Sequence, residues 1–188
     1  MATLLQPELE DKSFKEKFLP HLKTFNSMIY IVIVFSIFML ASCNKKPEPI
    51  VAPKNVNVSS NLFPDFLPYG LVANKGTWHS QSPPKYPEWV EIEYAKPTTI
   101  TYIAIQSQPD SVNGSEHKRA PKDFVFQGSN DRKNWVNLLN VKDNSYKEGG
   151  EWKSWSFKNK ASYTYYRIYM TANCGDPSYL TITQIKLK

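Results

Sequence analysis

Three polar segments of the sequence hold side chains that could bind a ligand rich in hydroxyl groups. They are residues 77–89, 107–120 and 171–179. Aromatic side chains can stack on the C–H face of a sugar ring, and planar Arg, Asn and His side chains hold polar groups in a fixed geometry. The candidate ligand-binding residues are Trp78, His79, Asn113, His117, Arg119, Asn173 and Tyr179.

Several of these candidates also have an ordinary structural interpretation. His79 could pack against the proline-rich part of its own loop, and Trp78 is interpreted more readily as a core residue than as a stacking platform. Residues 107–120 could form a solvated surface loop. Asp176 followed by Pro177 is typical of a turn. Residue types alone leave both interpretations open.

The sequence holds no pattern that is typical of a catalytic site. It contains no Gly-x-Ser-x-Gly, no HExxH and no phosphate-binding loop. His79 and His117 could meet a carboxylate in space, but hydrolysis needs a positioned pair of carboxylates or a nucleophile with its base. We therefore expect a protein that is not an enzyme.

The formal net charge of +6 is spread along the chain. Adjacent basic residues occur only as the pairs Lys45–Lys46, Lys118–Arg119 and Arg132–Lys133. Domains that bind nucleic acids usually gather their positive charge into a patch or a stripe. We therefore expect no nucleic-acid partner.

The N-terminal region has the features of a bacterial lipoprotein signal. Residues 28–40 carry no charge, and this run is shorter than the ~20 residues that cross a bilayer but suits the core of a signal peptide. The sequence Leu-Ala-Ser-Cys at 40–43 resembles a lipobox, in which Cys43 would carry the lipid. Residues 1–27 are long for a leader, so translation could begin near Met28, or this segment could be a long cytoplasmic leader.

These features predict three regions in the chain. Residues 1–42 are interpreted as a leader and lipoprotein signal peptide, residues 43–55 as a proline-rich linker to the lipid anchor, and residues 56–188 as one folded domain. The predicted location is the bacterial cell envelope, at the outer membrane or cell surface. With Cys43 acylated, Cys174 has no partner, so we expect no disulfide.

Residues 56–188 contain many short runs that are typical of strands, without helical periodicity. In residues 89–94, Glu91 and Glu93 alternate with apolar residues, and residues 100–106 are apolar on both faces and should form a central strand. The other expected strands are residues 56–60, 123–128, 135–141, 152–157, 165–171 and 180–188. Strands at this spacing predict an antiparallel sandwich or barrel.

Residues 129–132, Ser-Asn-Asp-Arg, lie between two of these strands. Asn and Asp stabilise turns by hydrogen bonding to their own backbone, so we interpret this charged cluster as a solvated hairpin turn and not as a binding site. The neighbouring Phe124, Phe126, Trp135 and Val136 are expected to contribute to the core.

The segments APKDFVFQGSNDRKNW (120–135), YYRIYM (165–170) and LTITQIKL (180–187) resemble the coagulation factor 5/8 type C, or discoidin, domains. These domains belong to the galactose-binding-like superfamily, which includes many bacterial carbohydrate-binding modules. The resemblance covers residues 56–188. It implies an all-β fold, an eight-stranded antiparallel jelly-roll β-sandwich, with the ligand loops at one end and both termini at the other.

The resemblance also implies roles for individual residues. His79 matches a histidine that galactose-binding relatives often use, and Asn113 before Gly114 matches an Asn-Gly of the family pattern. The arginine that precedes this pair in relatives is missing here, and Arg119 would have to substitute for it. The expected partner is a glycan of the galactose or N-acetylhexosamine type.

No cofactor is expected, and a structural calcium ion is doubtful. Many relatives bind calcium through an Asp-Gly before the loop tryptophan and an acid on the last strand. Here Asn74 and Lys75 precede Gly76, and Gln184 stands where the acid is expected. Amides beside a lysine are weaker calcium ligands than carboxylates.

From the residues and the resemblance together we predict a non-catalytic carbohydrate-binding module that a lipid anchor displays on a bacterial membrane surface. The alternative is a protein-interaction or adhesion module, or an accessory subunit of an outer-membrane complex, without a sugar site. This alternative stays open because discoidin sandwiches also bind proteins and lipid head groups, and a fold does not dictate its ligand.

Overall fold

The computed structural model describes residues 52–111 and 114–188 of the chain. The expected signal peptide, the lipidation site Cys43 and most of the linker lie outside these residues. The described part consists of strands and loops with two short helices, α2 (Gly70–Ala73) and η1 (Glu116–Arg119). Within it, no helical segment has the length and apolarity of a membrane span.

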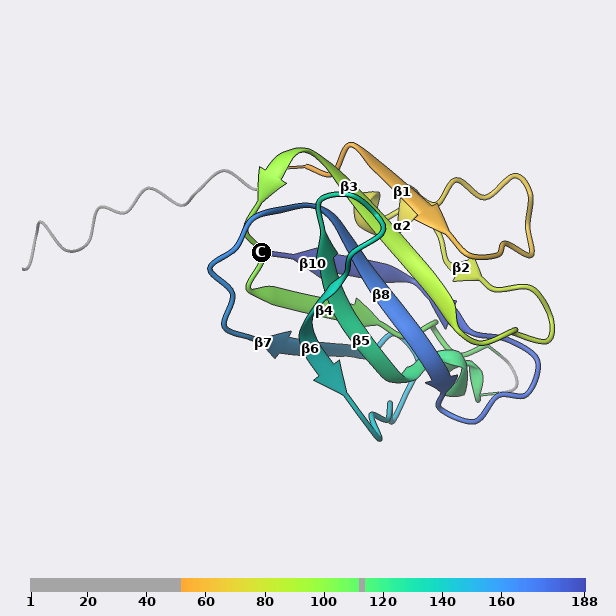
Figure 1. The fold of residues 1–188 in the computed structure, drawn as a ribbon. Helices are drawn as coiled ribbons and strands as arrows, with labels where there is room; N and C mark the ends of the chain where they lie inside the picture. The colour runs from red at the N-terminus through yellow and green to blue at the C-terminus, as the bar shows by residue number, and fades with distance from the viewer. Residues whose placement is uncertain (1–51, 112–113) are drawn as a thin grey trace, which may run out of the picture. The chain divides into compact units, whose positions relative to one another are not determined.

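The strands form two larger antiparallel sheets and one small one (Figure 1). The larger sheets have the orders β1-β3-β8-β5-β6 and β10-β4-β7 and together contain the eight strands that the sequence predicted, while β2 and β9 form a separate two-stranded pair. The strands are β1 (Asn55–Val58), β2 (Trp78–His79), β3 (Glu88–Thr98), β4 (Tyr102–Gln106), β5 (Pro121–Ser129), β6 (Val136–Val141), β7 (Trp152–Ser156), β8 (Tyr163–Asn173), β9 (Thr181–Ile182) and β10 (Gln184–Leu187).

The core lies between the two larger sheets. In β3 the apolar residues Val90 and Ile92 are fully buried in the core. Glu91 and Glu93 face the other side, where Arg132 pairs with both and covers Glu91, so the predicted alternation is confirmed. Strand β4 lies in the middle of the smaller sheet, as its two apolar faces predicted. Aromatic contacts join the sheets: Phe124 of β5 meets Trp155 of β7 edge to face, with ring centres 5.1 Å apart. Burial of such side chains is the main stabilising contribution to the fold.

The charged cluster at residues 129–132 is a hairpin turn, as predicted. The Ser129 hydroxyl accepts hydrogen bonds from the backbone N–H groups of Asp131 (3.2 Å) and Arg132 (3.0 Å). Arg132 has a left-handed φ of 58°. Its guanidinium donates to Glu91 (2.9 Å) on the outer face of the larger sheet, so this residue stabilises the hairpin.

The expectation that Trp135 and Val136 contribute to the core is wrong. A β-bulge pairs Phe126 with Leu139 but Gln127 with Asn137, so the alternation of β6 shifts by one residue. Trp135 therefore lies on the outer face, where the Arg167 guanidinium stacks 4.1 Å from its ring centre. Val136 is 49% exposed because β6 is an edge strand.

The loops that hold the candidate residues leave the same end of the sandwich. They follow β1 and β8 and precede β3 in the larger sheet, and they follow β4 in the smaller one. The last residue, Lys188, hydrogen bonds to Tyr102 at the opposite end of β4. Figure 1 accordingly shows the C-terminus at the far end from these loops.

Candidate functional site

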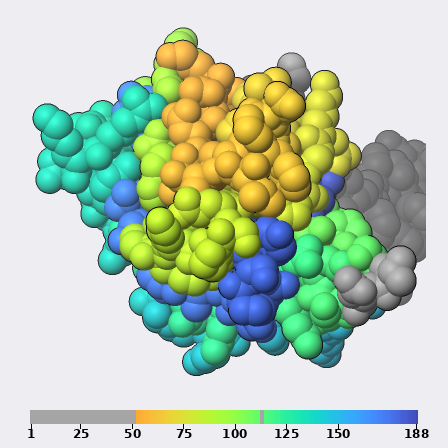
Figure 2. Space-filling model, turned by 90° about the vertical axis from the view of Figure 1, so that its right-hand side faces the viewer, coloured from red at the N-terminus to blue at the C-terminus, as the bar shows by residue number. Residues whose placement is uncertain are grey.

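Backbone hydrogen bonds fasten the loops to one another. Leu62 donates to His79 (3.1 Å), Ser80 donates to Leu180 (2.9 Å), and Asp176 donates to Lys118 (3.3 Å). Figure 2 shows the result from outside: segments from four separate parts of the chain, coloured orange-yellow, yellow-green, green and blue, meet on one face. The sandwich therefore brings the first, second and third candidate loops together, as the resemblance implied.

Trp78 anchors the first loop in the core. It pairs with Ile182 in the short β2–β9 ladder and is 0% exposed. Its indole N–H donates to the backbone carbonyl of Ser60 (2.8 Å), which satisfies the polar group of a buried tryptophan. Of the two interpretations of Trp78, the structure supports the core residue, so we do not include Trp78 in the ligand-binding surface.

His79 lies between two aromatic rings. The centre of its imidazole is 5.2 Å from the ring centre of Phe63 and 5.9 Å from that of Tyr179, and both contacts are edge to face. Its Nδ1 is buried, and no described residue forms a hydrogen bond with it. Burial, and then the positive charge of Arg119, lowers the pKa of His79 below its ordinary value. His79 is therefore a neutral imidazole at neutral pH.

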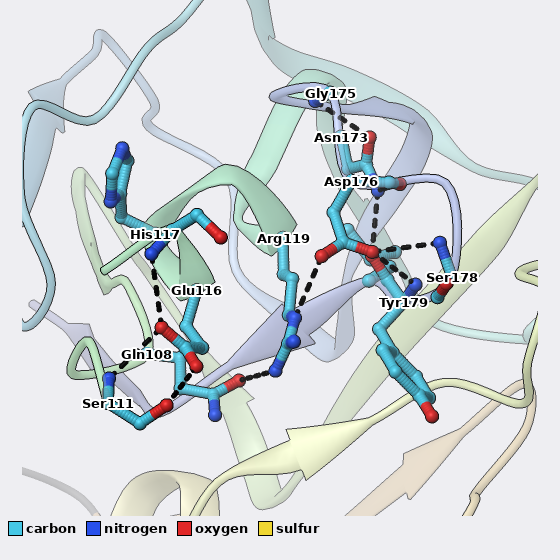
Figure 3. Close-up of polar contacts among 12 residues, drawn as sticks. Gln108, Ser111, Glu116, His117, Arg119, Asn173, Gly175, Asp176, Ser178 and Tyr179 are labelled. Atoms are coloured by element: carbon cyan, nitrogen blue, oxygen red, sulfur yellow. Dashed lines mark hydrogen bonds and ion pairs between the residues drawn. The ribbon is translucent and has the colours of Figure 1, made fainter. Parts of the chain in front are cut away.

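Arg119, at the end of η1, faces Tyr179 and Asp176 (Figure 3). Its Nε donates to Asp176 Oδ2 (2.9 Å), and its guanidinium carbon is 5.1 Å from the ring centre of Tyr179. A further guanidinium N–H donates to Gln108 Oε1 at 3.5 Å. Carboxylate, aromatic ring and amide therefore hold the guanidinium in one orientation.

Asp176 shapes the third loop. Its Oδ1 accepts hydrogen bonds from the backbone N–H groups of Ser178 (2.8 Å) and Tyr179 (3.0 Å). Burial alone would raise the pKa of Asp176, but the hydrogen bonds from Arg119 and these two N–H groups outweigh it and lower the pKa. Asp176 is therefore an anion that links the second loop to the third.

Asn173 has a structural role in the same loop. Its amide N–H groups donate to the backbone carbonyls of Asp176 (2.6 Å) and Tyr179 (2.7 Å), and its Oδ1 accepts from the N–H of Gly175 (3.0 Å). These bonds occupy the side chain and leave it little capacity for a ligand. Asn173 therefore positions Tyr179. The sequence alone could not distinguish this supporting role from direct contact with a ligand.

His117 fastens the second loop and lies apart from the other candidates. Its Nδ1 is 2.9 Å from Asp110 Oδ2, and its backbone N–H donates to the same carboxylate. In Figure 3 its ring points away from Arg119 and Tyr179. Glu116 similarly accepts backbone hydrogen bonds from Ser111 and Ser115. The predicted ligand residue Asn113 lies outside the described residues.

Phe63 belongs to the candidate site, but the sequence analysis did not predict it. It is 50% exposed, beside His79, in a proline-containing loop that has no strand pattern. The buried Glu88 holds the start of this loop by accepting from the Ser60 hydroxyl (2.8 Å). Phe66 packs inward against Gly76. The available signal was two phenylalanines in one loop, and sequence alone does not show which of them faces outward.

Residues 55–184 match the sequence model of the family described as "F5/8 type C domain". The chain belongs to the F5/8 type C (discoidin) family. This confirms the family that the sequence resemblance indicated. No curated protein was found to match the chain.

Solved structures of several carbohydrate-binding modules share the fold. Chitosan-binding module 2 of a Paenibacillus sp. IK-5 chitosanase/glucanase, in complex with chitotriose, is 15% identical with a TM-score of 0.58, over 73% of this chain and 97% of that one. A Clostridium perfringens CBM32 module in complex with GalNAc-β-1,3-galactose is 14% identical with a TM-score of 0.52, over 71% and 93%. The CBM32 of AlyQ in complex with 4,5-unsaturated mannuronic acid is 12% identical with a TM-score of 0.56, over 72% and 95%.

The residues where relatives hold calcium do not fit a calcium ion in this F5/8 type C domain. The Gln184 side-chain amide donates to Asn74 Oδ1, so the oxygen that a metal would need already accepts a hydrogen bond. Thr77 and Thr183 hydroxyls, 3.0 Å apart, form a second link beside it. Among the described residues there is no group of three or more His, Cys, Asp or Glu side chains that could hold a metal ion.

Proposed function

We propose that this chain is a non-catalytic carbohydrate-binding module whose site is formed by Phe63, His79, Arg119 and Tyr179. The observation that carries the proposal is the convergence of these four side chains from four segments of the chain at one end of the sandwich. Two aromatic rings and two planar polar groups are the combination that sugar recognition needs.

The geometry assigns a separate task to each side chain. Phe63 is half exposed and offers an apolar ring face to the C–H face of a pyranose. Arg119 donates to Asp176 through Nε, which leaves guanidinium N–H groups for sugar hydroxyls. His79 has its Nδ1 buried, so Nε2 is the ring nitrogen that would meet a ligand. Tyr179 completes the wall on the other side of His79.

The similar solved structures support a glycan as the ligand. They are complexes with chitotriose, GalNAc-β-1,3-galactose and 4,5-unsaturated mannuronic acid. We propose the galactose or N-acetylhexosamine type for this chain, because His79 stands where galactose-binding relatives use a histidine. Since these structures share less than a fifth of their residues with the chain, the assignment depends on the site residues.

The proposal includes display of the module on a bacterial membrane surface. Its support is the sequence alone: the apolar run at 28–40 followed by Leu-Ala-Ser-Cys at 40–43. The family resemblance implies that the loop end faces away from the membrane, because both termini of such domains leave from the other end. Metabolic labelling of the expressed protein with a clickable fatty acid, lost in Cys43→Ala, tests this part.

Titration calorimetry of the full chain with a panel of galactosides and N-acetylhexosamines tests sugar binding. Phe63→Ala should weaken binding at least about tenfold, which corresponds to about 1.4 kcal/mol. Val136→Ala is the matched control, because Val136 is as exposed as Phe63 but lies beside the hairpin turn. Failure of the folded protein to bind any sugar would refute the proposal. A stable protein partner whose capture is unaffected by sugar or by His79→Ala would favour the protein-interaction alternative.

A further inference from the structure

We infer that the site of Phe63, His79, Arg119 and Tyr179 takes a saccharide ring that is uncharged where it contacts the protein, and that it rejects uronic acids and free amino sugars. This inference rests on the proposed function and specifies the ligand class. The fold does not decide it, because the ligands named for the similar structures include an amino-sugar trimer, a uronic acid and a neutral N-acetylated disaccharide.

The two opposite charges at the centre of the site compensate each other. Arg119 Nε and Asp176 Oδ2 are 2.9 Å apart, and the two side chains are only 19% and 14% exposed. Pairs that are partly removed from water are weakly screened by salt, so each charge acts mainly on its partner. The pair as a whole has no net charge, and it still presents hydrogen-bond donors to a ligand.

A charged ligand therefore gains little attraction and still loses its hydration. A carboxylate that approaches Arg119 also meets the carboxylate of Asp176, and an ammonium group that approaches Asp176 also meets the guanidinium of Arg119. Removing a charged group from water costs free energy that an opposite, uncompensated charge offsets far better than a compensated one. Hydroxyl and acetamido groups lose far less, and the guanidinium N–H groups can still donate to them.

His79, the remaining polar group of the site, carries no charge. Protonated His79 would place an N–H at the buried Nδ1, where no described residue offers an acceptor. The imidazole therefore meets the ligand in its neutral form, through Nε2. Neutral imidazole forms hydrogen bonds with hydroxyl groups and gives a uronate no electrostatic advantage.

The acidic side chains of the neighbouring loop are engaged within that loop. Asp110 accepts from His117 and from the backbone N–H of Gly149 (2.9 Å), and Glu116 accepts from Ser111. Neither carboxylate is left to attract an amino sugar. Lys118 is exposed to solvent, where a charge is well screened and contributes little to affinity.

Matched sugars test the inference on the full chain. The panel contains galactose, N-acetylgalactosamine, galacturonic acid and galactosamine, and the four corresponding glucose-configured sugars. Within the series that binds, we expect the neutral members to bind at least about tenfold more tightly than the charged members. We also expect the affinity of the neutral members to be unchanged when the ionic strength rises from about 0.02 M to about 0.5 M.

Asp176→Asn tests the role of the ion pair. This variant leaves Arg119 without a carboxylate partner but keeps an oxygen that can accept from Ser178 and Tyr179. We expect the ratio of uronate to neutral-sugar affinity to rise about tenfold and to fall again at high salt. Glu93→Gln is the matched control, because it also removes a carboxylate paired with an arginine, Arg132, but on the outer sheet face.

The outcomes separate this inference from the proposed function. Tighter binding of a uronic acid or an amino sugar than of its neutral counterpart by the wild-type chain overturns the inference alone. An unchanged affinity ratio in folded Asp176→Asn also overturns it. Absence of binding to every sugar by the folded chain removes the proposed function and the inference together. If Asp176→Asn does not fold, the wild-type panel still decides.

Discussion

His79 and Tyr179 are far apart in the sequence, yet their rings lie 5.9 Å apart because β2 pairs with β9. The ladder aligns His79 with Thr181, two residues beyond Tyr179. It also places Trp78 opposite Ile182, both fully buried, so the core sets the position of the site. The proposed ligand surface is thus built on a short ladder that hydrophobic packing holds in register.

Trp78 should matter for stability and not for direct contact with a sugar. Trp78→Ala leaves a large cavity and removes the hydrogen bond to Ser60, so we expect the free energy of unfolding to fall by about 3–5 kcal/mol. Urea denaturation measures this. Trp135→Ala is the control on the outer face and should cost less than about 2 kcal/mol. Equal losses in the two variants would contradict the placement of Trp78 in the core.

Asn173 should act on ligand binding through Tyr179. Asn173→Ala removes hydrogen bonds to Asp176, Tyr179 and Gly175, so we expect both a loss of about 1–3 kcal/mol in stability and a several-fold loss of sugar affinity. Phe63→Ala should lower affinity without a comparable loss of stability. Chemical denaturation and titration calorimetry on both variants separate the two effects. Intact affinity in a destabilised Asn173→Ala variant would show that Tyr179 does not depend on this support.

His79 should titrate below its ordinary pKa of 6.5. Burial and the nearby Arg119 disfavour its protonated form in the folded state. Because the unfolded chain takes up the proton more readily, the stability contribution of neutral His79 is present above pH 6.5 and is lost as the pH falls through and below that value. An NMR titration, with His79→Gln to assign the signal, measures the midpoint. A midpoint at or above 6.5 would contradict the buried environment of Nδ1.

Calcium should have no effect on the domain. The Gln184 amide already donates to Asn74, so neither added calcium nor a chelator should shift the melting temperature. Gln184→Ala should cost no more than about 1 kcal/mol, because the hydrogen bond that it removes is exposed. Differential scanning fluorimetry measures the melting temperature of the wild-type chain with calcium, of the wild-type chain with a chelator, and of Gln184→Ala. A drop in melting temperature on chelation, restored by calcium, is the contrary result.

Much of the fold could be predicted because strand periodicity and turn chemistry are local. The alternation around Glu91 and the hairpin at Asp131 follow from such local patterns. Trp135 was placed wrongly because the bulge in β5–β6 reverses the alternation, and Val136 because β6 is an edge strand. No residue type in the sequence indicates a bulge or an edge position. Strand content was therefore predicted more reliably than the facing of individual residues.

The site was predicted in part. His79, Arg119 and Tyr179 do lie together, as the family resemblance implied. Asn173 and His117 have the right chemistry for a ligand, but their polar atoms bond within their own loops. Hydrogen bonds of this kind depend on loop conformation, which short-range patterns do not specify. Phe63 was missed for the related reason that an aromatic residue in a loop can face either way.

A chemical-shift titration of the isotope-labelled chain with the best-binding neutral sugar of the panel tests the central claim most directly. We predict that the backbone amide signals of residues 62–63, 79–80, 117–119, 176 and 178–180 shift and saturate together. The hairpin at residues 129–135 should not respond. Saturable shifts at the hairpin or the outer sheet face, with unchanged signals from the loops around His79, would contradict a glycan site at this end of the sandwich.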